Sequence, residues 1–161
     1  MHRLLPLTLL AFLLGCGTFK KPTVEEQIIA TIEAVTDGAQ RADLGETLEP
    51  FSLRYQDEDG LGRDGIKGLL FREFHRNGAI TSILGPIEVT VETTGEQANA
   101  SFDAVLMTGV SLLDGSPLPD QVEAWHFEVA LEREAENWRI TAHTREKGLD
   151  ATQLLERVPP S

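Results

Sequence analysis

The spacing of apolar residues changes character along this chain, and that change limits the folds open to it. Residues 23–43 and 64–76 carry apolar side chains every three to four positions, the spacing of one helix face. From residue 80 to residue 145 apolar and polar residues mostly alternate, as in strands with one buried face. Helices followed by a run of strands predict an α+β fold with an antiparallel sheet. A length of 161 residues suits one such domain.

The two helices have recognisable ends. Thr23 is expected to cap the first helix, with Glu26 completing a capping box, and Asp64 is expected to cap the second. Asn77-Gly78 should end the second helix. Gly38 interrupts the first stripe, which indicates that another element packs close there. The apolar positions are Val24, Ile28, Ile32, Val35, Ala39 and Ala42 in the first helix and Ile66, Leu69, Leu70 and Phe74 in the second.

The strands are predicted from alternation and from the turn residues between them. Gly85-Pro86 indicates a bend between two strands, and Ala135-Glu136-Asn137 a hairpin turn. The segment 114–120 contains two prolines and is expected to be a loop. The tail, 147–161, has spacing compatible with a short helix. The expected strands are 51–55, 80–84, 87–92, 98–107, 125–132 and 138–145.

Several short motifs resemble one known family. The stretch Tyr55-Gln56-Asp57-Glu58-Asp59-Gly60, followed by a helix opening at Arg63-Asp64, is similar to the first strand and next helix of the nuclear transport factor 2-like (NTF2-like) proteins. Trp125-His126-Phe127 and Trp138-Arg139-Ile140-Thr141 resemble their last two strands. This family includes the SnoaL-like polyketide cyclases and the ketosteroid isomerases. The resemblance implies a cone over residues 23–146, with helices covering the concave face of a curved sheet and a ligand entering between them.

The first residues resemble an export signal. A basic start precedes an apolar run from Leu4 to Leu14, whose 11 residues are too few to cross a bilayer. Leu13-Leu14-Gly15-Cys16 resembles the lipobox of bacterial lipoproteins. The resemblance implies removal of residues 1–15 and lipid attachment to Cys16. The alternative, a buried helix ending at a free cysteine, fits poorly because apolar residues cover every helical face.

Lipid on Cys16 would place the protein at the bacterial cell envelope, facing the periplasm. Residues 16–22 form the lipidated tether, and six extended residues reach only about 20 Å, so the domain should sit near the membrane. By analogy with enteric lipoproteins, Gly17 in place of aspartate favours the outer membrane.

The composition excludes several other classes. A formal charge of −12 argues against a nucleic-acid partner, which requires a basic face. One cysteine excludes an internal disulfide and a multi-thiolate metal site. No cofactor is predicted.

Alternation assigns the strand residues to two faces. The covered face is expected to hold Trp125, Phe127, Val129, Leu131, Trp138, Ile140, Ala142, Ile87, Val89, Val91, Phe102, Ala104 and Leu106. The outer face is expected to hold His126, Glu128, Glu132, Arg139, Thr141, His143 and Arg145, together with Asp103, Val105 and Met107. These last three leave a homodimer through this face as one possibility. The inward positions then carry almost no titratable groups, and the inward carboxylates of ketosteroid isomerases have no match, so the sequence favours a noncatalytic protein.

Candidate site residues remain near the expected mouth of the cone. Tyr55, Asp57 and His75 could form an acid–base group, or pack at the rim and at an exposed helix end. Tyr55, Trp125, Phe127 and Trp138 could stack on a flat apolar ligand, or simply form core.

Two sets of residues could be interpreted as metal sites, but a purely structural role explains each set better. The acidic cluster Asp57, Glu58, Asp59 and Asp64 has EF-hand-like Gly62, but Leu61 and Gly68 stand where calcium ligands are needed, so a solvated loop is favoured. His126 and His143 lack a third ligand for zinc. No metal is predicted.

Three functions follow from these interpretations. The first is a noncatalytic, lipid-anchored module that binds a small apolar ligand or an envelope partner protein. The second is a small isomerase, cyclase or hydrolase using Tyr55, Asp57 or His75. The third is a structural lipoprotein that dimerises.

Overall fold

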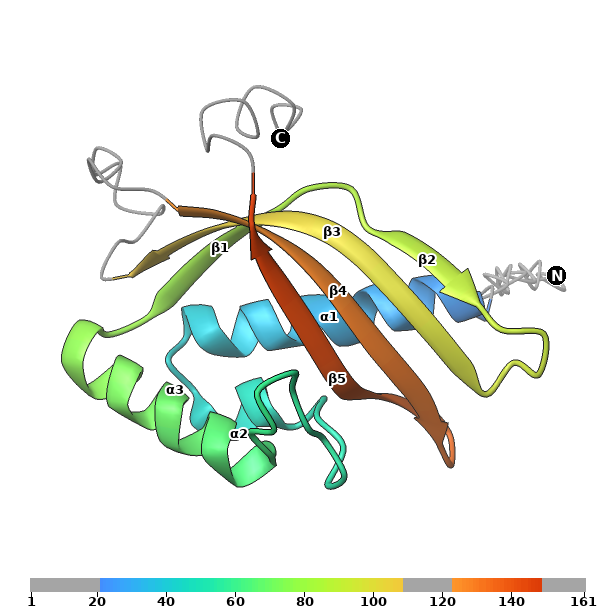
Figure 1. The fold of residues 1–161 in the computed structure, drawn as a ribbon, viewed down its shortest axis with the longest axis horizontal. Helices are drawn as coiled ribbons and strands as arrows, with labels where there is room; N and C mark the ends of the chain where they lie inside the picture. The colour runs from blue at the N-terminus through green and yellow to red at the C-terminus, as the bar shows by residue number, and fades with distance from the viewer. Residues whose placement is uncertain (1–20, 109–122, 149–161) are drawn as a thin grey trace, which may run out of the picture.

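A computed structural model describes residues 21–108 and 123–148, and it confirms the α+β class (Figure 1). The elements are α1 (Val24–Gln40), α2 (Leu44–Leu48), α3 (Arg63–Asn77), β1 (Ile80–Leu84), β2 (Glu88–Val91), β3 (Gln97–Thr108), β4 (Glu123–Glu134) and β5 (Asn137–Lys147). The signal with Cys16, most of the tether, the expected loop at 114–120 and the expected tail helix lie outside the described residues. In the described part, no helix is both long and apolar enough to cross a membrane.

The strands form one curved antiparallel sheet. Its order is β1-β3-β4-β5, and β2 pairs with the same edge of β3 that β1 uses. The predicted bend lies between β1 and β2, where the Gly85 amide donates to the Asp103 carbonyl at 2.8 Å. The sheet arches over α1, so α1 fills part of its concave side (Figure 1).

The predicted first helix is confirmed together with its cap. Thr23 Oγ1 accepts from the Glu26 amide at 3.2 Å, and Glu26 Oε2 accepts from the Thr23 amide at 2.6 Å. Ile28 and Ile32 are buried against the concave face of the sheet. The other buried members of this core are Tyr55, Ala98, Ala100, Phe102, Ala104, Val129, Leu131, Trp138 and Ile140.

The close approach expected at Gly38 is also found. A Cβ on Gly38 would lie 2.5 Å from the Thr47 amide nitrogen, because α2 packs directly on that backbone. The helix α2 was not predicted from the sequence. It is five residues long, and Asp43 Oδ1 caps it by accepting from the Glu46 amide at 2.9 Å.

The second predicted helix, α3, forms with a different start. Gly62 precedes its first turn without a side-chain cap, so the expected capping by Asp64 is wrong. Gly78 ends the helix at a φ of 76°, as predicted. No residue of α3 is fully buried, and Phe71 is 61% exposed. Half-buried Ile66 packs against the core.

The short strand expected at 51–55 does not form. Phe51 makes one isolated bridge with Ile140, and the chain then turns. Phe51 lies between two hydrogen bonds to β5: the Pro50 carbonyl accepts from the Ile140 amide at 2.9 Å, and the Ser52 amide donates to the Ile140 carbonyl at 2.9 Å. Alternation over five residues therefore indicated a segment beside the sheet rather than a strand.

A second apolar cluster lies on the convex side of the sheet. Val105 and Met107 are 1% and 2% exposed, and they pack with Ala124 and Ile83. Both residues point outward, as predicted, but they are buried within the chain. They do not form a free dimer surface, and dimerisation itself stays a prediction.

Candidate functional site

An irregularity in β5 decides which side chains face the concave side. Leu131 lies opposite Ile140, but Ala130 lies opposite Ala142, so Thr141 is an extra residue in the β4–β5 ladder. Its hydroxyl donates to the Ala130 carbonyl at 3.3 Å. A bulge of one residue reverses the alternation of every position that follows it.

The bulge corrects the predicted faces of β5. His143 lies opposite Val129, and Arg145 lies opposite Phe127, so both share the concave face with these inward residues. The expectation that His143 and Arg145 are outward is wrong. The same shift moves Ala142 from the predicted covered face to the convex face.

Tyr55 meets His143 at this concave face. The Gln56 amide donates to the Thr141 carbonyl at 3.0 Å, which fixes the chain beside Tyr55 to the bulge. Tyr55 is 2% exposed, and its hydroxyl lies 2.5 Å from His143 Nδ1. Their rings stack with centroids 5.9 Å apart. Residues 88 positions apart therefore form one polar pair inside the fold.

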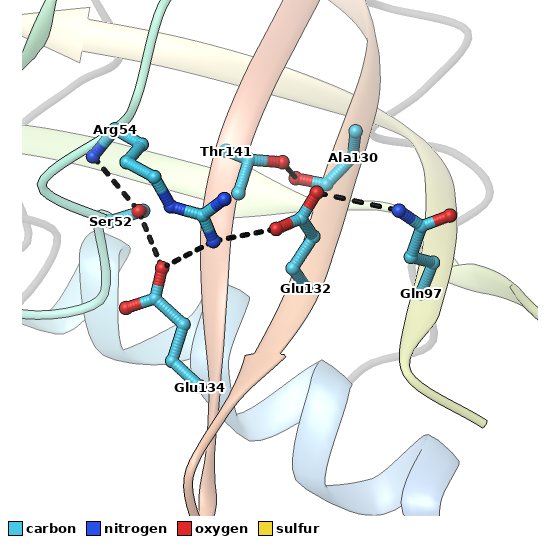
Figure 2. Close-up of polar contacts among 7 residues, drawn as sticks. All are labelled: Ser52, Arg54, Gln97, Ala130, Glu132, Glu134 and Thr141. Atoms are coloured by element: carbon cyan, nitrogen blue, oxygen red, sulfur yellow. Dashed lines mark hydrogen bonds and ion pairs between the residues drawn. The ribbon is translucent and has the colours of Figure 1, made fainter. Parts of the chain in front are cut away.

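A polar clamp holds the segment before Tyr55 against the β4–β5 hairpin (Figure 2). The buried Ser52 hydroxyl donates to Glu134 Oε1 at 2.7 Å and accepts from the Arg54 amide at 3.0 Å. The Arg54 guanidinium donates to Glu132 at 2.7 Å and to Glu134 at 3.2 Å. The hydrogen bond from the Ser52 hydroxyl is the main cause that lowers the pKa of Glu134, and the hydrogen bond from Arg54 is the second. The clamp positions Tyr55 from outside the core.

Burial sets the protonation of the Tyr55–His143 pair. Desolvation raises the pKa of Tyr55, and the negative charge of Asp57 adds to that rise. Desolvation lowers the pKa of His143, against the opposing effect of Asp57. At neutral pH the tyrosine is therefore a hydroxyl donor and the imidazole is neutral. His143 Nδ1 accepts the hydrogen bond from the tyrosine hydroxyl, so Nε2 carries the ring hydrogen. That hydrogen can be donated in a hydrogen bond to a bound molecule.

Aromatic rings surround the pair. Phe51 meets Tyr55 edge-on at 5.0 Å, and Phe127 lies 6.1 Å from the His143 ring. Phe102 stacks on Phe127 at 5.5 Å. Phe127 is half-buried. This lining fits an apolar ligand, and the His143 Nε2 hydrogen would be a polar contact within it.

The predicted aromatic set does not come together as one site. Trp138 lies opposite Arg133 at one end of β5 and is 3% exposed, which makes it core. Trp125 lies opposite Lys147 at the other end of β5, with the Arg145 guanidinium 5.2 Å from its ring centroid. Of the three predicted strand aromatics, Phe127 is the one beside the Tyr55–His143 pair.

Of the predicted acid–base group, the structure brings Tyr55 and Asp57 near each other and leaves His75 apart. Asp57 acts electrostatically on Tyr55 and His143, while its Oδ1 also accepts from the Leu61 amide at 2.7 Å and closes the acidic loop. His75 instead lies exposed on α3, stacked on Phe71 at 6.3 Å. His143 takes the place expected for His75. The sequence carried little signal for this, because Ala142, the first residue after the bulge, fits either face of a sheet.

A hollow of about 500 Å³ opens beside this site. It is lined by residues 53–56 and 60–65, which include Tyr55 and the first turn of α3. The loop and α3 therefore border an open region next to the buried pair.

The comparisons agree on architecture. No known protein family profile matches the chain, and no curated protein matches its sequence. Among solved structures, Aln2 from a Streptomyces species is similar at 13% identity with a TM-score of 0.65, and the match covers 86% of this chain and 97% of that one. An NTF2-like family protein from Streptomyces avermitilis, described as a proposed dehydratase, gives 15% identity, a TM-score of 0.64 and coverage of 78% and 97%.

This chain has the NTF2-like fold. The resemblance seen in the sequence is confirmed at the level of fold, since identities this low carry no more than that. Bd1075 from Bdellovibrio bacteriovorus matches at 7% identity with a TM-score of 0.62 over 75% of this chain. The chain spans only 40% of the length of Bd1075.

Proposed function

We propose that this protein is a noncatalytic, lipid-anchored module of the bacterial cell envelope that binds a small apolar molecule on the concave side of its sheet. The Tyr55–His143 pair within an aromatic lining carries the proposal. An apolar lining with one fixed donor suits a mostly apolar molecule that carries a single acceptor oxygen, such as a ketone.

The anchor in this proposal rests on the lipobox-like Leu13-Leu14-Gly15-Cys16. The helix α1 begins at Val24, eight positions after Cys16, so an anchored domain would stay close to the lipid surface. Gly17 supports the outer membrane as its location. Intact-mass measurement of the purified protein tests this part: the expected chain starts at Cys16 and carries acyl chains, and an unmodified Met1 start would contradict it.

Ligand binding can be tested with a neutral apolar dye, N-phenyl-1-naphthylamine, on the full chain in detergent. Two competitors of nearly equal shape, 2-acetylnaphthalene and 2-ethylnaphthalene, differ in one carbonyl oxygen. One neutral hydrogen bond contributes about 1 kcal/mol, so the ketone should compete about fivefold better.

The variant His143→Phe should retain dye binding and lose this preference for the ketone. Phe71→Ser, an exposed change on α3, is the matched control and should keep the preference. Absence of dye binding in the wild type, or a preference that survives His143→Phe, would count against the proposal.

A second candidate is proton-transfer catalysis by the same pair. The observation that favours it is that His143, not expected on the concave face, joins Tyr55 and the nearby charge of Asp57 there. This retains the isomerase, cyclase or hydrolase alternative with His143 in place of His75. Tyr55→Phe should then abolish turnover of a substrate that still binds, whereas a pure binding module would show no turnover to lose.

A further inference from the structure

A second histidine lies on the convex face of the sheet. Ser101 and Asp103 on β3 alternate with buried Ala100, Phe102 and Ala104, so both point outward. Asp103 lies directly opposite His126 on β4. His126 Nδ1 lies 2.9 Å from Asp103 Oδ1, and its Nε2 lies 3.2 Å from Ser101 Oγ.

These contacts give the three side chains distinct chemical roles. With Nδ1–H donated to the Asp103 carboxylate, Nε2 is the nitrogen that accepts the Ser101 hydroxyl proton. A hydroxyl, an imidazole that accepts its proton and a carboxylate that orients the imidazole are the parts of a nucleophilic triad. We propose that Ser101, His126 and Asp103 form such a triad for acyl transfer from esters that carry a cationic group.

The proposed reaction balances with water as the second reactant. Ser101 Oγ bonds to the ester carbonyl carbon while its proton moves to His126 Nε2. The bond to the leaving alcohol oxygen then breaks, and that oxygen takes the proton from His126. Water, losing its proton to His126, attacks the acyl-serine and releases the acid, and the proton returns to Ser101.

A hollow next to Ser101 provides space for a small ester. Its volume is about 330 Å³, and Ser101, Asn99 and Thr90 are among the residues that line it. Asn99 lies two positions before Ser101 on the same strand face. Its side-chain amide is the group that could donate to the oxygen that becomes negative during attack.

The charges around the hollow select the substrate class. Glu88 and Glu128 are the direct cross-strand partners of Ser101 on β2 and β4, and both line the hollow. Cross-strand partners have Cβ atoms about 5 Å apart, so two carboxylates flank the nucleophile. These two carboxylates repel an anionic ester and attract an ester with a cationic group. They also disfavour the negative charge that forms on the ester oxygen during attack, and the attraction for the cationic group offsets that unfavourable effect.

A fluorophosphonate reagent, which phosphonylates activated serines, tests the triad on the full chain in detergent. The expected result is one phosphonyl group, mapped by mass spectrometry to Ser101. Ser101→Ala should abolish this adduct, and His126→Gln should slow labelling at least about 100-fold. Thr93→Ala, which removes a hydroxyl from the exposed turn after β2, should label like the wild type.

Hydrolysis measurements test the substrate class. Acetylthiocholine should be cleaved with a higher kcat/KM than neutral phenyl thioacetate, and Glu128→Gln should lower the value for the cationic ester at least about threefold more than for the neutral one. Since these changes lie on the convex face or in an exposed turn, thermal unfolding followed by circular dichroism should show each variant folded. Labelling that persists in Ser101→Ala, a labelling rate unchanged in His126→Gln, or hydrolysis unchanged in Ser101→Ala would overturn the proposal.

Discussion

His143 and His126 lie in neighbouring strands of one sheet, yet the sheet gives them opposite surroundings. His143 faces the concave side among aromatic rings and bonds to the buried hydroxyl of Tyr55. His126 faces the convex side, where its side chain is 40% exposed and lies between Ser101 and Asp103. The face of the sheet on which a histidine lies, more than the residue type, therefore decides which groups it can contact. In β5 one bulge residue, Thr141, determines that face.

Deletion of Thr141 would disturb the concave side most severely. Without the extra residue, Ala142 would follow Ile140 directly and still lie opposite Ala130, so His143 would keep the concave face in a regular ladder. The Gln56 amide would lose the Thr141 carbonyl that fixes the chain beside Tyr55, and the hydroxyl bond to Ala130 would also be lost, so the deletion should cost about 3 kcal/mol in the free energy of unfolding. Urea unfolding measures it.

A length-preserving change is the control for this deletion. Thr141→Val keeps the bulge and removes only the hydroxyl bond to the Ala130 carbonyl, so it should cost about 1 kcal/mol. If the deletion variant is too unstable to purify, the control still shows that the position tolerates substitution. A deletion variant as stable as the wild type would contradict the role given to the bulge.

The energetic contrast between the two faces can be tested within β4. Leu131 is 1% exposed on the concave side, and Leu131→Ala should cost about 3 kcal/mol through lost burial and the cavity left behind. Glu128→Ala, on the exposed convex side, should change stability by less than about 0.5 kcal/mol. Equal costs for the two variants, measured by urea unfolding, would contradict the assignment of faces.

The concave pair itself should contribute a smaller amount. Tyr55→Phe removes the hydroxyl and leaves His143 Nδ1 without its donor, which should cost about 1.5 kcal/mol. A double-mutant cycle with His143→Phe should give a coupling energy of about 1 kcal/mol. A coupling near zero would mean that the bond does not form in solution.

The last prediction concerns pH. The pKa of His143 is lowered in the folded protein, mainly by burial, so between its folded and unfolded pKa values the unfolded chain binds more protons. Stability should therefore fall as pH drops below about 6.5, the usual histidine pKa, and level off once the folded value is passed. In His143→Phe this part of the pH dependence should disappear. The further loss of stability at lower pH, where carboxylates such as that of Glu134 gain protons, should remain.

Much of the fold could be predicted because its signals are local. The capping box at Thr23 and the turn at Ala135-Glu136 depend on residues close in sequence, and the structure confirms both. Alternation in β3 was also correct, because that strand pairs with β4 from Gln97 to Leu106 without a bulge. The short helix α2 was missed because five residues are too few to show helical spacing.

The candidate site could be predicted only in part. Tyr55 and Asp57 were predicted from their place near the expected mouth of the cone, but His143 was assigned to the wrong face. The error came from Thr141, whose extra position is visible only when β5 is paired with β4. Pairing His143 with Tyr55 also needs contact across 88 positions, which no local pattern encodes.

The sequence by itself determined the α+β class, the two long helices with the strands that follow them, and the resemblance to the NTF2-like fold, because periodicity and turn chemistry act over a few residues. The tertiary structure alone decided which histidine joins Tyr55 and which joins Ser101 and Asp103. Strand register is set by the packing of the whole sheet, and a single unpaired residue within it changes which side chains are taken out of water.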